Sequence, residues 1–171
     1  MWILFLIAFI PMLTGAIYYH PAVVGTAWMK ENGFTTASFK GNNMAKMLGL
    51  AYLASLFIAF ALLPMVIHQI GIMSVLMEHP GFDTAGGASR LVYADLMANY
   101  GETSRNFGHG MFHGILTGLL LAGGAVGLNA IFEQRSFKYW AIHTVYFMIT
   151  LGLMGGAIAQ LVPFPTAEYG L

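Results

Sequence analysis

The sequence predicts an all-α integral membrane protein, folded as a bundle of four transmembrane helices. Of its 171 residues, 58% are hydrophobic and only 8% are charged, whereas a soluble domain carries about 25% charged residues. The apolar residues also gather into four long blocks without Asp, Glu, Lys or Arg. About 20 helical residues cross a hydrocarbon core of about 30 Å. We therefore expect spans at residues 2–19, 47–77, 107–132 and 139–161.

The first expected helix, residues 2–19, ends before Pro21, because proline disfavours a helical residue before it and has no N–H to donate. Pro11 predicts a kink within this helix. The block has no basic start and no small-residue cleavage pattern, so we interpret it as a span and not as a secretory signal. A short amphipathic helix at 22–31, ended by Gly33, is expected to lie at the membrane interface in the first connection.

The second apolar block, residues 47–77, can be capped at its start by the Asn-Asn pair at 42–43. As one helix it would measure about 45 Å, more than the membrane requires. It must therefore tilt, bend at Pro64 or protrude. The loop after it, residues 78–106, is the longest connection outside the membrane, and residues 86–100 within it are expected to form a helix along the surface.

The third and fourth helices are joined by the short charged turn 133–138, which predicts an antiparallel hairpin. Four spans place the first and third connections on one side of the membrane, and both termini with the second connection on the other. The first side carries five basic residues, Lys30, Lys40, Lys46, Arg135 and Lys138, and the second carries Arg90 and Arg105. The excess of basic residues predicts that the first side is cytoplasmic and that both termini face outward.

Glycines four residues apart predict close helix packing. Lipid tails give helices no hydrophobic reason to associate, so contact through small residues supplies much of the packing energy. The glycines in question are Gly110, Gly114 and Gly118 on the third helix and Gly152 and Gly156 on the fourth. They are expected either to pack the chain's own helices or to bind a partner helix, and we favour the first.

Three histidines of the membrane helices are candidate metal ligands, because ionisable side chains inside spans are costly and are therefore associated with function. His109 and His113 lie one helical turn apart on one face, and His68 lies in the outer part of the second helix. They could hold zinc or copper, or one histidine from each helix could ligate a b-type haem. Polar neighbours that could orient them are Glu102, Thr103 and Asn106. Alternatively, His109 and His113 lie at the interface and bond to water, head groups or the loop.

Composition and motifs exclude several other functions. The chain has no cysteine, which excludes disulfides, thiolate metal sites, iron–sulfur clusters and covalently attached haem. Seven basic and seven acidic residues give no electrostatic case for a nucleic-acid partner. There is no G-x-S-x-G, no H-E-x-x-H and no phosphate-binding glycine loop. We therefore expect no catalytic residue and no enzyme activity.

Two parts of the sequence resemble a known family. Residues 15–21, Gly-Ala-Ile-Tyr-Tyr-His-Pro, and residues 25–30, Gly-Thr-Ala-Trp-Met-Lys, resemble the opening of the bacterial family called domain of unknown function 1761. Residues 129–138 and 155–158 resemble its last helix hairpin. The resemblance implies a small four-span bacterial protein of the plasma (inner) membrane, and it supplies no catalytic residue.

The sequence favours a non-enzymatic accessory or assembly subunit that needs no cofactor. Its expected partners are membrane lipids and other membrane-protein subunits, or a second copy of itself. One alternative is a haem- or metal-binding membrane protein that uses the outer histidines. Another is a carrier for a small molecule or lipid, formed as an oligomer.

Overall fold

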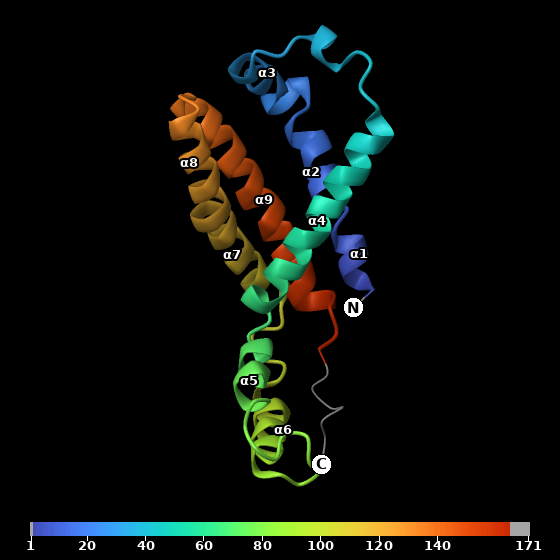
Figure 1. Ribbon diagram of the computed structural model, residues 1–171, viewed down its shortest axis with the longest axis vertical. Coiled ribbons are helices and arrows are strands. Elements are labelled where there is room, and N and C mark those ends of the chain that lie inside the picture. The colour runs from blue at the N-terminus through green and yellow to red at the C-terminus, as the bar shows by residue number, and fades with distance from the viewer. Residues whose placement is uncertain (1, 165–171) are drawn as a thin grey trace.

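The computed structural model describes residues 2–164, and this part of the chain contains helices and no strand. Its α-helices are α1 (Ile3–Ile7), α2 (Ile10–Tyr18), α3 (Thr26–Asn32), α4 (Met44–Val66), α5 (Gln69–Leu76), α6 (Ala88–Tyr100), α7 (Phe107–Thr117), α8 (Gly123–Phe132) and α9 (Phe137–Leu161) (Figure 1). Between them lie the π-helical turns η1 (Pro21–Gly25) and η3 (Gly118–Ala122) and the 3₁₀ turn η2 (Thr36–Phe39). The predicted all-α class is confirmed for the described residues.

Three helices of the described part are long and apolar enough to cross a membrane: α4, the continuous helix 107–132 and α9. A fourth candidate is a bent pair, Ile3–Tyr18 and Pro21–Asn32, whose two halves meet at 53°. By itself Ile3–Tyr18 measures about 24 Å, which is shorter than a hydrocarbon core of about 30 Å. The described residues therefore hold three candidate spans, or four if the bent pair forms one.

The second apolar block, 47–77, is not one helix. It begins as predicted, since the Asn43 side chain caps α4 by accepting a hydrogen bond from the Lys46 N–H at 3.0 Å. However, α4 ends at Val66, and Ile67 has an extended backbone (φ −98°, ψ 92°). Pro64 lies inside the last turn of α4, where it removes one helical hydrogen bond and crowds the preceding turn. The apolar block is thus divided into α4 and α5 by a break after Val66, and not at Pro64 itself.

The N-terminal segment also follows the sequence prediction closely. α1 ends at Ile7, and α2 restarts with Pro11 in its first turn, so the expected kink lies just before this proline. After Tyr18, η1 and α3 form the expected short helix of the first connection. α3 ends at Gly33, whose φ of +66° is a left-handed conformation that glycine adopts without strain.

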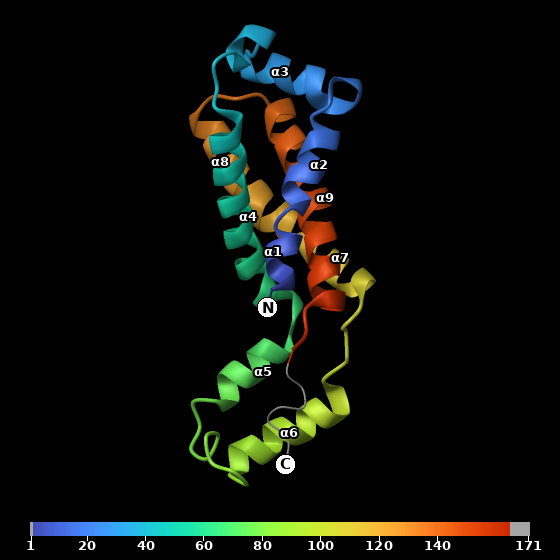
Figure 2. The same ribbon diagram turned by 90° about the vertical axis from the view of Figure 1, so that its right-hand side faces the viewer.

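α9 is the central helix of the bundle. Half of its most apolar 18-residue window is buried, against 22% for α4 and 17% for helix 107–132. The hairpin partner α7–α8 runs along one side of α9, and α1, α2 and α4 pack against other sides (Figures 1 and 2). The main core comes from three of these helices, through Leu4 and Ile7 of α1, Leu62 and Val66 of α4, and Met154 and Ile158 of α9.

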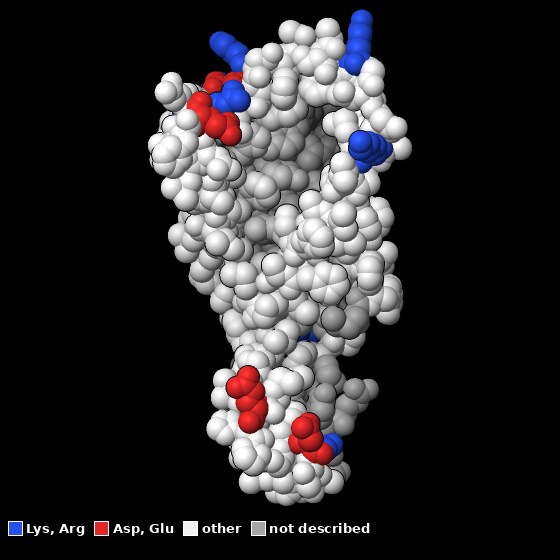
Figure 3. All heavy atoms as spheres, in the orientation of Figure 1, with Lys and Arg blue, Asp and Glu red and all other residues white. Residues whose placement is uncertain are grey.

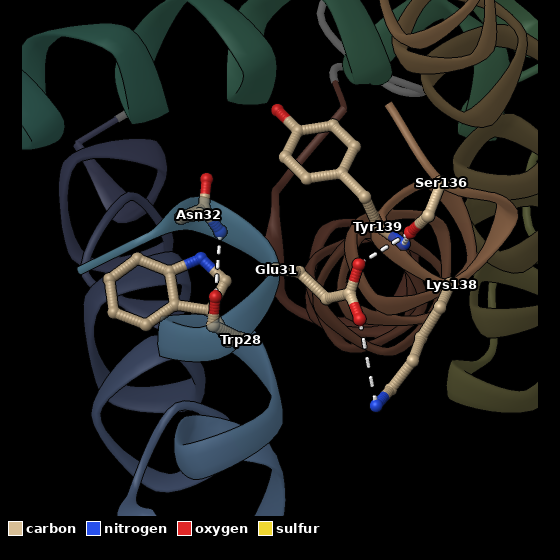
Figure 4. A network of polar contacts seen from close by, with 6 residues as sticks. All are labelled: Trp28, Glu31, Asn32, Ser136, Lys138 and Tyr139. Atoms are coloured by element: carbon tan, nitrogen blue, oxygen red, sulfur yellow. Dashed lines mark hydrogen bonds and ion pairs between the residues drawn. The ribbon is translucent and has the colours of Figure 1, made fainter. Parts of the chain in front are cut away.

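A polar network joins the first and third connections at one end of the bundle (Figure 4). Glu31 of α3 accepts a hydrogen bond from the Ser136 hydroxyl and forms an ion pair with Lys138 at 3.7 Å. Ser136 itself caps α9 by accepting a hydrogen bond from the Tyr139 N–H at 3.0 Å. The two connections therefore lie at the same end, as the sequence predicted.

The opposite end carries a separate lobe, residues 69–100, which contains α5 and α6 and extends beyond the bundle (Figures 1 and 2). We call it the α5–α6 lobe. It has a small core of its own, made by Phe82, Tyr93 and Met97, and α6 confirms the helix predicted within 86–100. On the face shown in Figure 3, acidic side chains lie over this lobe and also at the α3 end, where most of the Lys and Arg side chains gather.

Two side chains hold the loop 101–106, which joins the α5–α6 lobe to α7. The buried Gln69 amide donates hydrogen bonds to the carbonyl oxygens of Gly101 at 2.8 Å and Thr103 at 3.0 Å. Arg105 donates to the carbonyl oxygen of Val162, the C-cap of α9, where a cation is favoured by the helix dipole. Burial lowers the pKa of Arg105, and the charge of Glu102 acts in the opposite direction.

Candidate metal centre

The three predicted histidines meet where the α5–α6 lobe joins the bundle. His109 Nε2 lies 3.0 Å from His68 Nε2 and 3.1 Å from His113 Nε2. Their possible ligand atoms all lie within 4.8 Å of one another. His109 and His113 are partly buried, and His68 is exposed. The cluster therefore lies at the surface, with one side open to a further ligand.

Two local features of the chain bring these side chains together. The break after α4 places His68 at the N-cap of α5. Asn106 starts α7 by accepting a hydrogen bond from the His109 N–H at 2.9 Å. Because side chains four residues apart lie on one helical face, His113 then stands over His109. Asn106, expected to orient a ligand ring, thus acts on the backbone of His109.

The other two polar neighbours are placed differently from Asn106. Thr103 contributes its backbone carbonyl oxygen to the Gln69 amide. Glu102 is exposed. In the sequence it stands between Gly101 and Thr103, whose carbonyl groups accept hydrogen bonds from Gln69. Gln69, which was not among the residues predicted from the sequence, is therefore the side chain that holds the loop before α7 near the break.

The hydrogen-bonding capacity of imidazole limits how this cluster can exist without a cation. A ring nitrogen of a neutral imidazole carries either one proton or one lone pair. His109 Nε2 faces two other ring nitrogens at 3.0 and 3.1 Å, so it cannot make a linear hydrogen bond to both. A metal ion could accept the lone pairs of all three nitrogens at once. The arrangement therefore fits an ion better than a hydrogen-bonded triad.

The spacing of the nitrogens agrees with this conclusion. Zinc–nitrogen bonds of about 2.0–2.1 Å in a tetrahedral site separate two ligand nitrogens by about 3.3 Å. The 3.0 and 3.1 Å separations from His109 Nε2 are close to that value, and all the candidate ligand atoms lie within 4.8 Å of one another. The rings are tilted or perpendicular to one another, with centroids 4.6 to 5.3 Å apart. Because His109 Nε2 lies close to a ring nitrogen of each of the other two histidines, a single ion fits better than a flat haem held between two histidines.

The remaining described histidines lie elsewhere and have other contacts. His143 of α9 lies toward the α3 end, where its Nδ1 is 3.2 Å from the Tyr19 hydroxyl. His20 caps η1 by accepting a hydrogen bond from the Ala22 N–H. Beyond α5, the backbone carbonyl of His79 accepts a hydrogen bond from Ser89.

The predicted packing glycines lie in the contact between α7–η3 and α9. A Cβ on Gly110, Gly114 or Gly118 would overlap the backbone of α9, including the carbonyl oxygen of Leu151 for Gly114. On α9, Gly152 faces Ile115, and Gly156 faces Phe107. Gly155, which its spacing in the sequence does not single out, also belongs to this contact, because a Cβ there would overlap the Gly110 carbonyl. The close approach fixes α7, and hence His109 and His113, against the central helix.

Two apolar depressions adjoin the histidines. The first, about 350 Å³, lies on the bundle and is lined by Met65, His113, Leu116, Thr117, Leu120 and Leu121. The second, about 510 Å³, lies on the lobe and is lined by His68, Gly71, Ile72, Val75, Leu76 and Leu96. Sequence reasoning missed both, because each is formed by residues distant in the chain.

Comparison with known proteins assigns the chain to a family and adds no activity. Residues 2–159 match the family model described as "Protein of unknown function (DUF1761)". This range includes the three histidines, the packing glycines and all but the last residues of α9. Neither the curated proteins nor the solved structures provide a match. The resemblance seen in the sequence is confirmed: the chain belongs to the DUF1761 family.

Proposed function

We propose that this protein is a metal-binding integral membrane protein that holds one transition-metal ion through His68, His109 and His113. The observation that supports this function is that His109 Nε2 lies 3.0 Å from His68 Nε2 and 3.1 Å from His113 Nε2, with all the candidate ligand atoms within 4.8 Å of one another. Three imidazoles without thiolates suit zinc or copper. A three-histidine set also leaves a fourth coordination position for water or another ligand.

We also propose four spans, of which Ile3–Tyr18 is the first, with α3 lying along the interface. The two charged residues of α3, Lys30 and Glu31, support this placement, as does the bond from Glu31 to the α8–α9 turn. The positive-inside rule then places the α3 end in the bacterial cytoplasm. The α5–α6 lobe and the histidine cluster would face outward, so metal would arrive from outside the cell.

Metal analysis of the purified protein tests the function. The chain, carrying an affinity tag without histidine, is purified in detergent, loaded with Zn²⁺ or Co²⁺, dialysed and measured by elemental analysis. We expect about one ion per chain, because the three nitrogens form one site. The absence of cysteine simplifies the result, since no thiolate competes for the ion.

Substitutions identify the ligands. His68→Ala, His109→Ala and His113→Ala should each weaken binding by more than the roughly 10- to 100-fold loss typical of outer neighbours of a metal site. His79→Ala is the control and should bind as the parent does, because His79 is not part of the cluster. Equal metal content in all four variants, with unchanged circular dichroism, would refute the assignment.

A further inference from the structure

The depression beside His113 continues into the bundle. Met65, Thr117 and Leu121 line it and also line a deeper apolar pocket of about 190 Å³ between α4, helix 107–132 and α9. We call the two together the α4–α7 groove. Its wall on helix 107–132 extends from His113 to Ala125, about 18 Å along the helix axis. One end of the groove is therefore a histidine of the cluster, and the other is apolar.

The groove results from the way α4 packs. α4 contacts α7 and α9, but it diverges from the α8–α9 end of the hairpin toward α3 (Figure 1). Figure 3 shows the surface hollowed between them. The π-helical turn η3 lies in the wall, and such turns are common at functional sites because they disturb the regular helical repeat.

The residues that line the α4–α7 groove favour a ligand with an apolar hydrocarbon chain. Apart from His113 and Thr117, its lining residues are aliphatic, aromatic or Met. The Thr117 hydroxyl already donates to the His113 carbonyl at 2.8 Å, so its proton is not available for a hydrogen bond to a ligand. Leu120 and Leu121 beside it are 69% and 63% exposed on a candidate span. The groove thus opens toward acyl chains and not toward water.

With a metal ion bound, the charge of the histidine cluster favours a ligand with an anionic head group. Three neutral imidazoles leave a divalent ion with its full charge, and among the described residues the cluster has no carboxylate member. The fourth position of such an ion binds an oxygen ligand, and a carboxylate adds favourable charge. The head group and the chain of one molecule would therefore occupy neighbouring sites.

On these observations we infer that the metal centre binds a single-chain anionic amphiphile from the bilayer, with its carboxylate on the ion and its chain in the α4–α7 groove. The inference rests on the proposed metal site. It adds a ligand class: a long-chain carboxylate and not a water-soluble anion. It also assigns a role to the α4–α7 groove, which a site for a free ion would not need.

Cobalt provides the test, because its visible spectrum reports ligands at the open position. The Co²⁺-loaded protein in nonionic detergent is titrated with dodecanoate and, separately, with acetate, which has the same head and almost no chain. We expect dodecanoate to change the spectrum at a concentration at least about tenfold lower, because burial of its chain adds to the metal–carboxylate bond.

A matched pair of variants locates the chain. Ala61→Phe places a large side chain in the deeper pocket, about 8 Å along α4 from its end at Val66. It should bind cobalt and acetate as the parent does but lose the preference for dodecanoate. Ala51→Phe makes the same change at an exposed α4 residue that is not among the lining residues of the groove, and it should keep the preference.

The outcomes separate the two proposals. A protein that binds no cobalt overturns the metal site and, with it, this inference. A protein that binds cobalt but responds equally to acetate and dodecanoate keeps the metal site and overturns the amphiphile. A dodecanoate preference that survives Ala61→Phe also overturns it, because the chain would then lie elsewhere.

Discussion

At the residue scale, Gly114 has the most restrictive surroundings of the predicted packing residues. It is buried, and a Cβ at this position would overlap the backbone of Leu151 and Gly152 on α9. Backbone atoms of a helix cannot move aside as the end of a flexible side chain can. The row of Gly110, Gly114 and Gly118 is therefore covered by the chain's own central helix, and a partner helix would have to displace α9 to reach it.

We predict that Gly114→Ala destabilises the protein by about 1–3 kcal/mol, the usual cost of overpacking a close contact. The measurement is loss of helical circular dichroism on heating in one detergent. Gly124→Ala is the control, because a Cβ there meets open space, and it should be neutral or stabilising by about 0.5–1 kcal/mol. Equal midpoints for the two variants would mean that α7 and α9 can separate at little cost.

At the scale of elements, the attachment of α3 to the start of α9 depends on Glu31. Its carboxylate bonds the Ser136 hydroxyl and pairs with Lys138, and the Glu31 side chain is only 18% exposed. The Lys138 side chain is 57% exposed, so its ion pair should contribute little. Most of the attachment should therefore come from the hydrogen bond to the helix cap.

We predict that Glu31→Ala speeds hydrogen exchange of the α3 amides, residues 26–32, because a hydrogen bond to a charged group contributes about 1.5–3 kcal/mol. Lys138→Met, which keeps the hydrogen bond between Glu31 and Ser136, should change this exchange by less than about 1 kcal/mol. Similar exchange in both variants would place the attachment in apolar contacts of α3 and not in Glu31.

At the scale of the whole molecule, the number of spans depends on the first segment. With four spans, Trp2 and Asp83 lie on one side of the membrane and Lys40 on the other. With three spans, in which Ile3–Tyr18 does not cross, Trp2 shares a side with Lys40. The native sequence has no cysteine, so single cysteines introduced at these positions report their own accessibility.

We predict that Trp2→Cys and Asp83→Cys react with an impermeant maleimide in intact spheroplasts, and that Lys40→Cys reacts only after lysis. Full labelling of all three in detergent is the control. Reaction of Trp2→Cys only after lysis would contradict the four-span proposal, and the reverse pattern for all three would contradict the orientation. The predicted outward C-terminus concerns residues 165–171, which lie outside the described residues.

The accessory-subunit and oligomeric-carrier hypotheses also belong to this scale, and both stay predictions. Any partner would contact the exposed apolar faces of α4 and helix 107–132. Only 22% of the most apolar 18-residue window of α4, and 17% of that of helix 107–132, is buried. Lipid alone would also cover such faces, so they do not favour a protein partner over the bilayer. Purification from native membranes, with co-purifying proteins identified, tests these hypotheses.

The sequence by itself determined which segments are apolar, that the Asn pair at 42–43 and Gly33 cap helices, and which histidines and glycines are candidates. These features depend on composition, spacing and backbone preferences, which are local. It also located His109 and His113 on one face, because helical periodicity relates residues four apart.

Only the tertiary structure decided that α4 ends at Val66, that His68 meets two histidines of α7, and that an apolar groove starts at the cluster. His68 and His109 are 41 residues apart, so their distance depends on the α4–α5 break, the Gln69 anchor and the packing of Gly114 on α9. Each is a contact between segments distant in the chain. Spacing along a sequence constrains one helix, whereas a site between helices is fixed by how they pack.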